Sequence, residues 1–476
     1  MRAFRVPLLA LVFAAATTWL VFGVRGQAGT PISLLISGGT VVTMNAAGDV
    51  VDNGAVAVAG DKIVEVGPAD ALTSKYQPAA RVDARGQVIL PGLINTHTHA
   101  PMVLYRGLAD DLALNDWLEH HIFPAEAKTV SPDFVRVGTR LAALEMIESG
   151  TTTFADMYYF EDDVAEVTRE AGLRAVLGQS VIQFPVADAK TPEEALARAE
   201  AFIKKWKDDP LITPAVAPHA PTTVQPETLT AARALANKYG VPLLIHLAET
   251  RDEVNAIQAA HHASPTQYLE SLGLWQGRSL AAHGVWLGDA DMKTLAKRGV
   301  GVAHNPESNM KLASGIAAVS KWLAAGMRAG LGTDGAASNN DLDMFEAMRI
   351  AAFLQKVSTM DPRTLPARQA LELATRRGAE ALGLDTAIGS LEPGKQADVI
   401  TVAMDDARQT PMYDAISHLV YVSRGDDVRN TIVAGHVLMR DHEVLTLNRA
   451  DVLRDARAMA ARVRAAFAAP PAKEKH

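Results

Sequence analysis

The sequence predicts an α/β protein whose main part is a closed (β/α)8 TIM-type barrel, and three observations lead to this prediction. Eight short apolar runs alternate with segments of helical periodicity through the middle of the chain, which is typical of a parallel sheet covered by helices. Several of these runs end in a histidine or an aspartate, at the strand ends where barrel enzymes place their chemistry. Segments rich in β-branched residues flank the barrel region on both sides in the sequence, and we expect them to form one small β-sandwich domain.

These differences in residue pattern divide the chain into the expected domains. Residues 30–90 and 385–446 hold short β-branched runs separated by Gly, Asn and Asp clusters, which predicts a small antiparallel sheet shared by the two flanks. Residues 91–384 are expected to form the catalytic barrel. Residues 447–476 form a C-terminal helix and tail, with the helix over about 450–468 because Ala, Arg and Leu dominate there.

Residues 1–29 lie outside the fold prediction. Arg2 and Arg5 precede an apolar run that reaches Val24, and small residues follow up to Gly29. This order is typical of a secretory signal peptide, so we expect an exported protein, periplasmic or secreted. The run also approaches the ~20 residues that span a bilayer, so an uncleaved membrane anchor stays open. A cytoplasmic location is the alternative if the leader does not function.

Composition excludes several classes of function. The 476-residue chain has a net charge of −8 and no long basic stripe, which argues against a nucleic-acid partner. It contains no cysteine, so disulfides, thiolate nucleophiles and Cys-ligated zinc are excluded. Any metal must therefore be held by His, Asp or Glu.

The eight apolar runs of the barrel can be placed individually. The first two end near His97 and Phe154, and the others span 173–177, 211–217, 241–246, 279–283, 300–304 and 328–333. Between the first two, Ser131 followed by Pro132 predicts the start of a helix, with the serine as N-cap and the proline in the first turn.

Ionisable residues at these strand ends predict a metal site. Because side chains alternate along a strand, His97 and His99 face the same way. His246, His283 and Asp334 each end a later apolar run, where polar groups are costly to bury unless they are paired. Three of these imidazoles together with the carboxylate, and one position left open, would match a catalytic zinc-type site.

The sequence resembles the amidohydrolase superfamily and, within it, the 5-methylthioadenosine/S-adenosylhomocysteine deaminases. The resemblance runs from about residue 32 to residue 445. It rests on the stretches PGLINTHTHAPMVLYRGLADD, WLEHHIFPAEAK, APHAPTTV, HLAET, AAHGVWL, VAHNPESNMKLASG and GLGTDGAASNNDLD.

The resemblance implies a set of metal ligands. His97, His99, His246 and Asp334 match the residues that bind one divalent metal per subunit, expected to be zinc. The stretch 175–181, where family members with two metals carry a bridging lysine, has none. One metal per subunit is therefore the prediction.

The resemblance also implies catalytic and substrate-binding residues. Glu249 matches the family's acid/base carboxylate, His283 the histidine that orients water or substrate, and Asp334 the group that takes the proton of the attacking water. Glu126 and His219 match positions that contact the nucleoside, Glu126 at the ribose hydroxyls. Glu249 and Asp334 are expected to contact the substrate as well.

The implied reaction is the hydrolytic deamination of an adenine nucleoside to the 6-oxopurine product and ammonia, with 5-methylthioadenosine, S-adenosylhomocysteine or adenosine as substrate. The loop over 178–192 has no arginine, and Arg174 lies too deep in its strand to serve. Arginine binds a carboxylate strongly through two parallel hydrogen bonds. Without an arginine in this loop, it stays open whether the site accepts the amino-acid tail of S-adenosylhomocysteine. Two alternatives to this function stay open. The first is a related amidohydrolase that acts on guanine, a pterin or a triazine, and the second is a barrel that has no catalytic activity.

Some features stay undecided at this level. Trp117 is either a core residue or a stacking wall of the site. His304 and Ser338 are expected to shape loops rather than to touch substrate. A homo-oligomer is open, and the expected partner is a small-molecule nucleoside, with a membrane involved only if residues 1–29 remain as an anchor.

Overall fold

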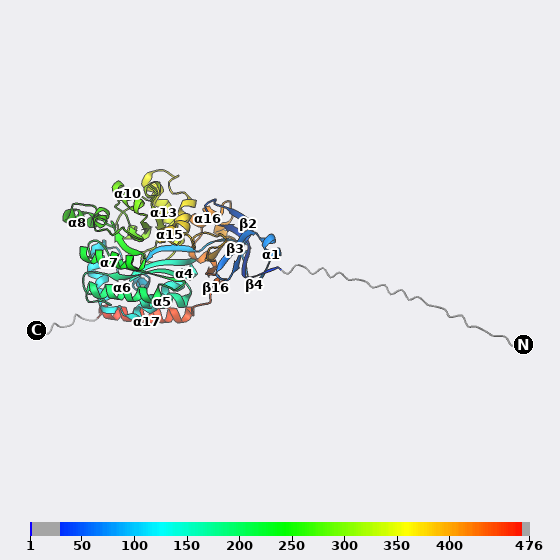
Figure 1. The fold of residues 1–476 in the computed structure, drawn as a ribbon, viewed down its shortest axis with the longest axis horizontal. Helices are drawn as coiled ribbons and strands as arrows, with labels where there is room; N and C mark the ends of the chain where they lie inside the picture. The colour runs from blue at the N-terminus through cyan, green and yellow to red at the C-terminus, as the bar shows by residue number, and fades with distance from the viewer. Residues whose placement is uncertain (2–28, 469–476) are drawn as a thin grey trace.

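The computed structural model describes residue 1 and residues 29–468, which form a barrel with a smaller β-sheet domain beside it (Figure 1). Residues 2–28 of the predicted leader lie outside the described part of the chain. Within the described ranges, no helix combines the length and the apolar character needed to cross a membrane.

Eight parallel strands form the barrel, and they are neighbours in chain order. They are β6 (Leu93–Thr98), β7 (Thr151–Tyr158), β8 (Arg174–Val181), β9 (Ile212–Pro218), β10 (Leu243–Leu247), β11 (Ser279–His283), β12 (Gly301–His304) and β13 (Arg328–Leu331). The first and last strands meet beyond the end of β13, where the Asp334 N–H donates to the His97 carbonyl (3.0 Å) and the Thr333 N–H to Asn95 Oδ1 (3.1 Å). The predicted barrel is confirmed.

Helices pack around the barrel (Figure 1); those up to α12 connect its strands, and α13 to α15 follow the last strand, β13. They are η1 (Ala100–Tyr105), α2 (Leu114–Asp116), η2 (Trp117–Ile122), α3 (Phe123–Thr129), α4 (Pro132–Glu148), α5 (Glu161–Ala171), α6 (Pro192–Trp206), α7 (Pro226–Tyr239), α8 (Arg251–His261), α9 (Pro265–Ser271), α10 (Asp289–Arg298), α11 (Pro306–Lys311), α12 (Val319–Ala324), α13 (Met344–Thr359), α14 (Ala367–Leu373) and α15 (Arg376–Leu382). As the sequence predicts, the Ser131 hydroxyl caps α4 by accepting the Phe134 N–H (3.2 Å).

The two flanks of the chain join in one sheet of nine strands. Its elements are β1 (Thr30–Val42), β2 (Val50–Ala59), β3 (Lys62–Pro68), β4 (Tyr76–Asp83), β5 (Gln87–Pro91), β14 (Val399–Ala403), β15 (Val428–Val433), β16 (His436–Arg440) and β17 (Glu443–Val444), with α1 (Ala69–Lys75), η3 (Ala407–Gln409), α16 (Ala415–Tyr421) and η4 (Gly425–Asp427) between strands. The last helix, α17 (Arg449–Ala468), lies along α4 at the edge of the barrel (Figure 1).

The flank sheet is mixed rather than purely antiparallel, which differs from the prediction. Both β4 and β5 run parallel to β1, while the remaining pairs are antiparallel. The reason is α1, a short helix between β3 and β4 that the strand pattern does not reveal. A helical crossover returns the chain to its starting edge, so the next strand runs parallel.

Strands from both ends of the chain share the core of this small domain. Leu34 and Ile36 of β1 lie in the same buried cluster as Val399 of β14 and Ile432 of β15. Since neither flank can bury these side chains without the other, the two flanks form one structural unit.

A short helix and an apolar cluster fill the amino end of the barrel. Ile94, Leu244 and Leu280 of three strands pack with Leu382 of α15. The approach is close at Gly301, where an added Cβ would lie 2.1 Å from a carbonyl oxygen of α15. This end of the barrel is therefore closed, and chemistry is left to the other end.

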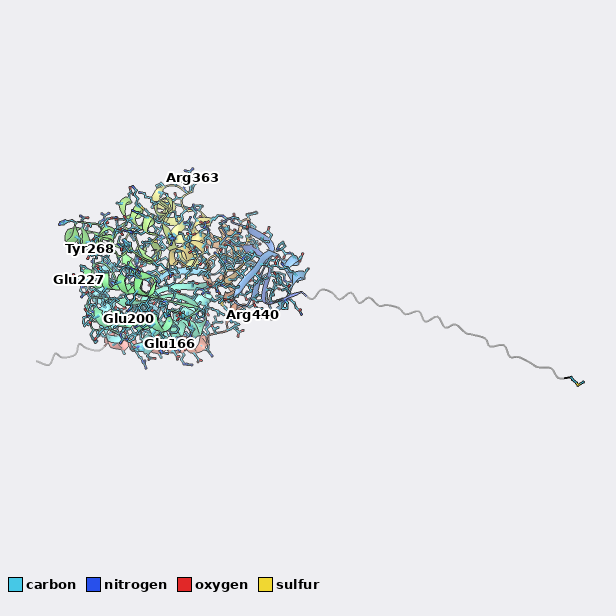
Figure 2. All side chains as sticks on the ribbon, viewed as in Figure 1. Glu166, Glu200, Glu227, Tyr268, Arg363 and Arg440 are labelled. Carbon is cyan, nitrogen blue, oxygen red and sulfur yellow. The ribbon has the colours of Figure 1, made fainter. Side chains whose placement is uncertain are left out.

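The outer helices carry ion pairs at the surface, as at Glu166 of α5 and Glu200 of α6, which Figure 2 labels. The Lys205 ammonium lies 3.0 Å from Glu166, and the Lys238 ammonium lies 2.8 Å from Glu200. Exposed pairs of this kind contribute about 0–1 kcal/mol each, so the buried clusters account for most of the stability of the fold.

Candidate metal centre and active site

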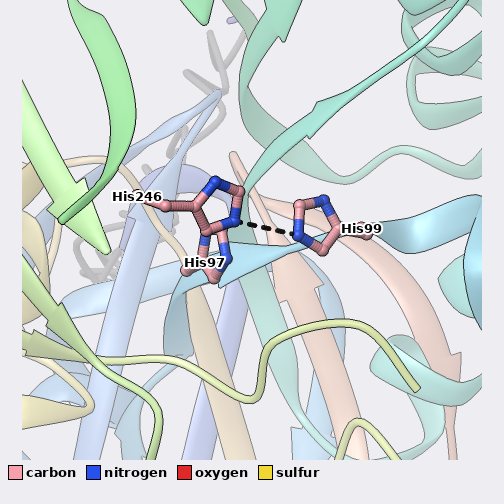
Figure 3. A group of neighbouring side chains, drawn as sticks. All are labelled: His97, His99 and His246. Atoms are coloured by element: carbon pink, nitrogen blue, oxygen red, sulfur yellow. Dashed lines mark hydrogen bonds between the residues drawn. The ribbon is translucent and has the colours of Figure 1, made fainter. Parts of the chain in front are cut away.

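Three imidazoles converge at the carboxyl end of the barrel (Figure 3). His97 lies in β6, His99 directly follows that strand, and His246 lies in β10. The Nε2 atoms of His99 and His246 are 3.3 Å apart, and one ring nitrogen of each of the three histidines lies within 4.8 Å of the others. Strand alternation and a shared barrel end thus bring together side chains about 150 residues apart in the chain.

Asp334 completes this group from the loop after β13. Its Oδ1 lies 3.4 Å from Nε2 of both His97 and His99. The Ser308 and Ser338 hydroxyls donate to its Oδ2 at 2.7 and 3.0 Å. Although burial alone would raise the pKa of Asp334, the neighbouring imidazoles of His97 and His99 hold it well below its usual range, so the carboxylate is ionised.

The donor atoms fit a divalent metal. The Nδ1 atoms of His99 and His246 lie 2.7 and 2.8 Å from backbone carbonyls of Met157 and His219, which accept only, so Nδ1 carries the proton and Nε2 presents a lone pair. Burial lowers the pKa of His97 to about 4, and its Nε2 has no hydrogen-bond partner among the described residues.

Lone pairs that face each other at 3.3 Å repel unless a cation lies between them. Two nitrogens bound to a tetrahedral zinc at ~2.0–2.1 Å are about 3.3–3.4 Å apart, which matches this separation. His97, His99, His246 and Asp334 are therefore placed to hold a metal, and they are the four ligands that the family resemblance implies.

Glu249 and His283 stand beside these ligands. His283 Nε2 lies 3.7 Å from Glu249 Oε2 and 3.9 Å from Asp334 Oδ2, and its Nδ1 lies 2.9 Å from Asn309 Oδ1. Burial raises the pKa of Glu249. Burial alone would lower the pKa of His283, but the two carboxylates raise it overall. Such a carboxyl next to a metal site is equipped to carry a proton.

A cavity of about 490 Å³ opens from this site. It is lined by the site residues His99, His246, Glu249, His283 and Asp334, and also by residues that include Met102, Leu118, Phe123 and Thr222. Trp117 lines the same cavity and is 5% exposed, so it serves both as a core residue and as a wall of the site. The volume suits a small organic molecule.

Glu126 and His219 also line the cavity. Glu126 of α3 accepts hydrogen bonds from the hydroxyls of Tyr158 (2.7 Å) and Tyr159 (3.4 Å), and burial raises its pKa to about 7. Burial lowers the pKa of His219 to about 3, and its Nδ1 lies 2.8 Å from the Thr223 hydroxyl. A neutral imidazole and a buried carboxyl can bind hydroxyls and ring nitrogens.

All eight residues that the sequence singles out lie in one site. Sequence reasoning missed the residues that support them, among them Ser308 and Asn309 of α11 and Tyr158 of β7, because a lone hydroxyl or amide carries no recognisable pattern in the sequence. The Ser338 hydroxyl bonds the Gly335 carbonyl within its own turn (3.1 Å), in line with a loop-shaping role, and it also donates to Asp334. Another supporting residue, Glu253, could have been found from the sequence, because Thr250 stands three residues before it and the two form a capping-box pattern.

A parallel (β/α)8 barrel with histidine and aspartate ligands at its carboxyl end defines a metal-dependent hydrolase. The chain belongs to the amidohydrolase family, whose model matches residues 88–438. A second, short match covers residues 54–76 and is described as an imidazolonepropionase-like composite domain of bacteria, which agrees with the composite flank domain.

Relatives and solved structures agree with this assignment. The chain is 48% identical over 427 residues to a 5-methylthioadenosine/S-adenosylhomocysteine deaminase of Syntrophobacter fumaroxidans, which covers 90% of this chain and 97% of the relative. It is 46% identical over 429 residues to a 5'-deoxyadenosine deaminase of Methanosarcina acetivorans, again with 90% and 97% coverage. A crystal structure of an adenosine deaminase from Xanthomonas campestris with bound zinc superposes with a TM-score of 0.90 at 40% identity, covering 92% of this chain and 100% of that one.

Proposed function

We propose that this protein is a zinc-dependent deaminase that hydrolyses the 6-amino group of an adenine nucleoside to give the 6-oxopurine nucleoside and ammonia. The observation that carries the proposal is the position of Glu249, a buried carboxyl 3.7 Å from His283 and beside the candidate metal ligands. The names of the relatives, which are adenine-nucleoside deaminases, support the same substrate class.

One metal ion would be held by His97, His99, His246 and Asp334. When bound, such an ion lowers the pKa of a water molecule to about 7 and so supplies a nucleophile near neutral pH. Support for zinc is the all-nitrogen-and-carboxylate donor set, in a chain without cysteine, together with the zinc in the Xanthomonas structure.

The residues of the chain move the protons. Asp334, ionised and held by two serine hydroxyls, accepts the proton of the attacking water. Glu249, whose pKa burial raises, donates a proton to the ring nitrogen next to the carbon that is attacked. The resulting Glu249 carboxylate takes the proton of the hydroxyl now on that carbon and passes it to the amino group, so the C–N bond breaks with release of ammonia. The proton held by Asp334 then restores Glu249 to its acid form. His283 holds the oxygen at the reacting carbon.

The cavity favours a nucleoside whose 5' group carries no negative charge. Among the described residues that line it, there is no arginine or lysine, and the exposed side of the lining includes Glu119 and Asp252. The nearby Lys311 is engaged with Asp110. Because a carboxylate is costly to bury without a partner, we expect adenosine, 5'-deoxyadenosine and 5-methylthioadenosine to be better substrates than S-adenosylhomocysteine.

A substrate panel with two variants tests the proposed function. Ammonia release is measured for adenine nucleosides, free adenine, guanine and a triazine, with wild type, Glu249→Gln and the exposed control Glu227→Gln. We expect nucleoside activity, with Glu249→Gln retaining its zinc and losing about 10²–10⁴-fold in kcat. Activity on free bases or triazines alone, or near-normal turnover of Glu249→Gln, would overturn the proposal.

A matched pair of nucleosides tests the charge preference. Adenosine 5'-carboxylate and adenosine 5'-carboxamide have nearly the same shape and differ in charge. We expect kcat/KM to be higher for the carboxamide by about tenfold or more. A tenfold difference corresponds to ~1.4 kcal/mol, and burying a carboxylate without a partner should cost at least that much. Equal values would show that the cavity does not select by charge.

We also propose that the protein is exported. The support is the order of charged, apolar and small residues over 1–29, which is typical of a signal peptide. N-terminal sequencing of the protein purified from its host tests this. A start near residue 30 in a periplasmic or secreted fraction agrees with cleavage, an intact start in the membrane fraction indicates an anchor, and an intact cytoplasmic protein contradicts export.

A further inference from the structure

The turn after β10 presents Glu249 to the site in an unusual backbone conformation. Ala248 has a φ of +48°, in the left-handed region that residues with a side chain rarely adopt. A turn of this kind persists only where its surroundings hold it. The question is therefore what holds the residue directly before the proton-carrying carboxylate.

The Glu249 side chain does not anchor itself. Among the described residues, no hydrogen bond reaches its carboxylate, and His283 Nε2 lies 3.7 Å from its Oε2. A free carboxylate suits a group that must accept and donate protons within one turnover. Its position consequently depends on the backbone from which it extends.

Glu253 holds that backbone. Its Oε1 accepts the Ala248 N–H at 2.8 Å, and its Oε2 accepts the Glu249 N–H at 2.9 Å. On the opposite side of the turn, the Ala248 carbonyl accepts the Trp286 N–H at 3.0 Å. These two hydrogen bonds, from consecutive peptide groups to the two oxygens of one carboxyl group, determine the direction in which the Glu249 side chain leaves the chain.

We propose that Glu253 is a positioning residue for the reaction, which acts by clamping the Ala248 and Glu249 peptide groups with both oxygens of its carboxylate. This inference rests on the proposed function, since it takes Glu249 as the proton carrier. It assigns to Glu253 no contact with the reacting atoms.

The chain contains a matched control for this role. Glu253 is the third residue of α8, and its own N–H donates to the Thr250 hydroxyl that caps the helix (3.2 Å). In α6, Glu194 has the same place, with its N–H on the Thr191 hydroxyl (3.3 Å), and its carboxylate accepts the Lys190 N–H (2.6 Å). Both glutamates support a helix start in the same way, but only Glu253 reaches a catalytic turn.

Three variants of the zinc-loaded full-length protein test the clamp: Glu253→Gln, Glu253→Asp and Glu194→Gln. Glutamine keeps the size but presents an N–H₂ to one of the two N–H donors, whereas aspartate keeps the charge but is too short to reach both. We expect each Glu253 variant to lose about 10–100-fold in kcat, because a displacement of about 1 Å costs about that much, with KM and zinc content close to wild type. Glu194→Gln should keep the kcat of wild type.

Two results would overturn the proposal. One is a wild-type kcat in Glu253→Asp or Glu253→Gln, since the clamp would then be dispensable. The other is an equal loss in Glu194→Gln, since the effect would then come from helix capping in general.

Crystal structures of zinc-loaded wild type and Glu253→Gln give a readout that does not depend on activity. We expect the Glu249 carboxylate to move away from His283 or to occupy several positions in the variant, while the four metal ligands stay in place. An unmoved Glu249 would refute the clamp. If the wild type deaminates no nucleoside, the proposed function fails, and these structures still decide whether Glu253 positions Glu249.

Discussion

The two ends of the barrel strands differ in what they bury. At the amino ends, Leu244 of β10 and Leu280 of β11 pack in an apolar cluster with Leu382 of α15. At the carboxyl ends of the same two strands, His246 and His283 are buried among other ionisable groups. Leu244 and His246 are only two residues apart, so they face the same side of one strand.

The difference separates stability from function. The apolar end stabilises the fold in every ionic condition, because its contacts need no partner beyond other carbon atoms. The polar end holds imidazoles whose Nε2 atoms face each other at 3.3 Å, and a His97 Nε2 without a hydrogen-bond partner among the described residues. Such an arrangement stabilises the fold only when a cation is bound. We therefore assign these residues to the reaction and not to the stability of the fold.

The largest effect is expected from His246→Ala. This change removes one of the four candidate ligands, so we expect zinc content to fall and kcat to drop on the order of 10³-fold or more, because the nucleophile near neutral pH depends on the metal. Circular dichroism and a urea titration with chelator present should show a folded protein of nearly wild-type stability. Full activity with a full complement of zinc would contradict the assignment of His246 to the metal site.

Leu244→Ala, two residues away, should have the opposite outcome. Emptying this buried position should lower the free energy of unfolding by about 2–5 kcal/mol, measured by urea titration of the zinc-loaded protein. The kcat at 25 °C should stay within about threefold of wild type. Leu244→Met, which conserves volume, is the control and should cost under about 1.5 kcal/mol. A collapse of kcat in folded Leu244→Ala would break the separation of the two ends.

A smaller effect, dependent on pH, is expected from Glu126→Gln. Burial raises the pKa of Glu126 to about 7, above the usual value of about 4.3 that it has in the unfolded chain. The folded state therefore holds this proton more tightly, and stability falls as pH rises from about 4 to about 7.

Glutamine removes that penalty, so Glu126→Gln should be more stable than wild type by about 1–3 kcal/mol at pH 8 and equal to it near pH 4. Urea titrations at the two pH values measure this difference. The KM for nucleosides should rise if Glu126 binds the ribose. An equal stability difference at both pH values would show that Glu126 does not titrate in this way.

Much of the fold and of the candidate site could be predicted from local patterns in the sequence. The alternation of apolar runs and helical segments predicts the eight-strand barrel, and the residues that end those runs include every candidate ligand. The α1 crossover was missed, and with it the parallel pairing of β4 and β5 with β1, because a seven-residue helix leaves too short a periodic signal. The support of Asp334 by Ser308 was missed for another reason, since that contact joins α11 to the loop after β13, 26 residues further along the chain.

By itself, the sequence determined which residues lie at the barrel mouth, because strand period and strand ends are properties of the chain. Only the tertiary structure decided how far apart their atoms lie, which imidazole nitrogen faces the site, and which groups hold Glu249. These depend on hydrogen bonds between segments remote in sequence, such as His246 to the His219 carbonyl. They also depend on burial, which shifts the pKa values of Glu126 and Glu249 and exists only once the barrel has closed.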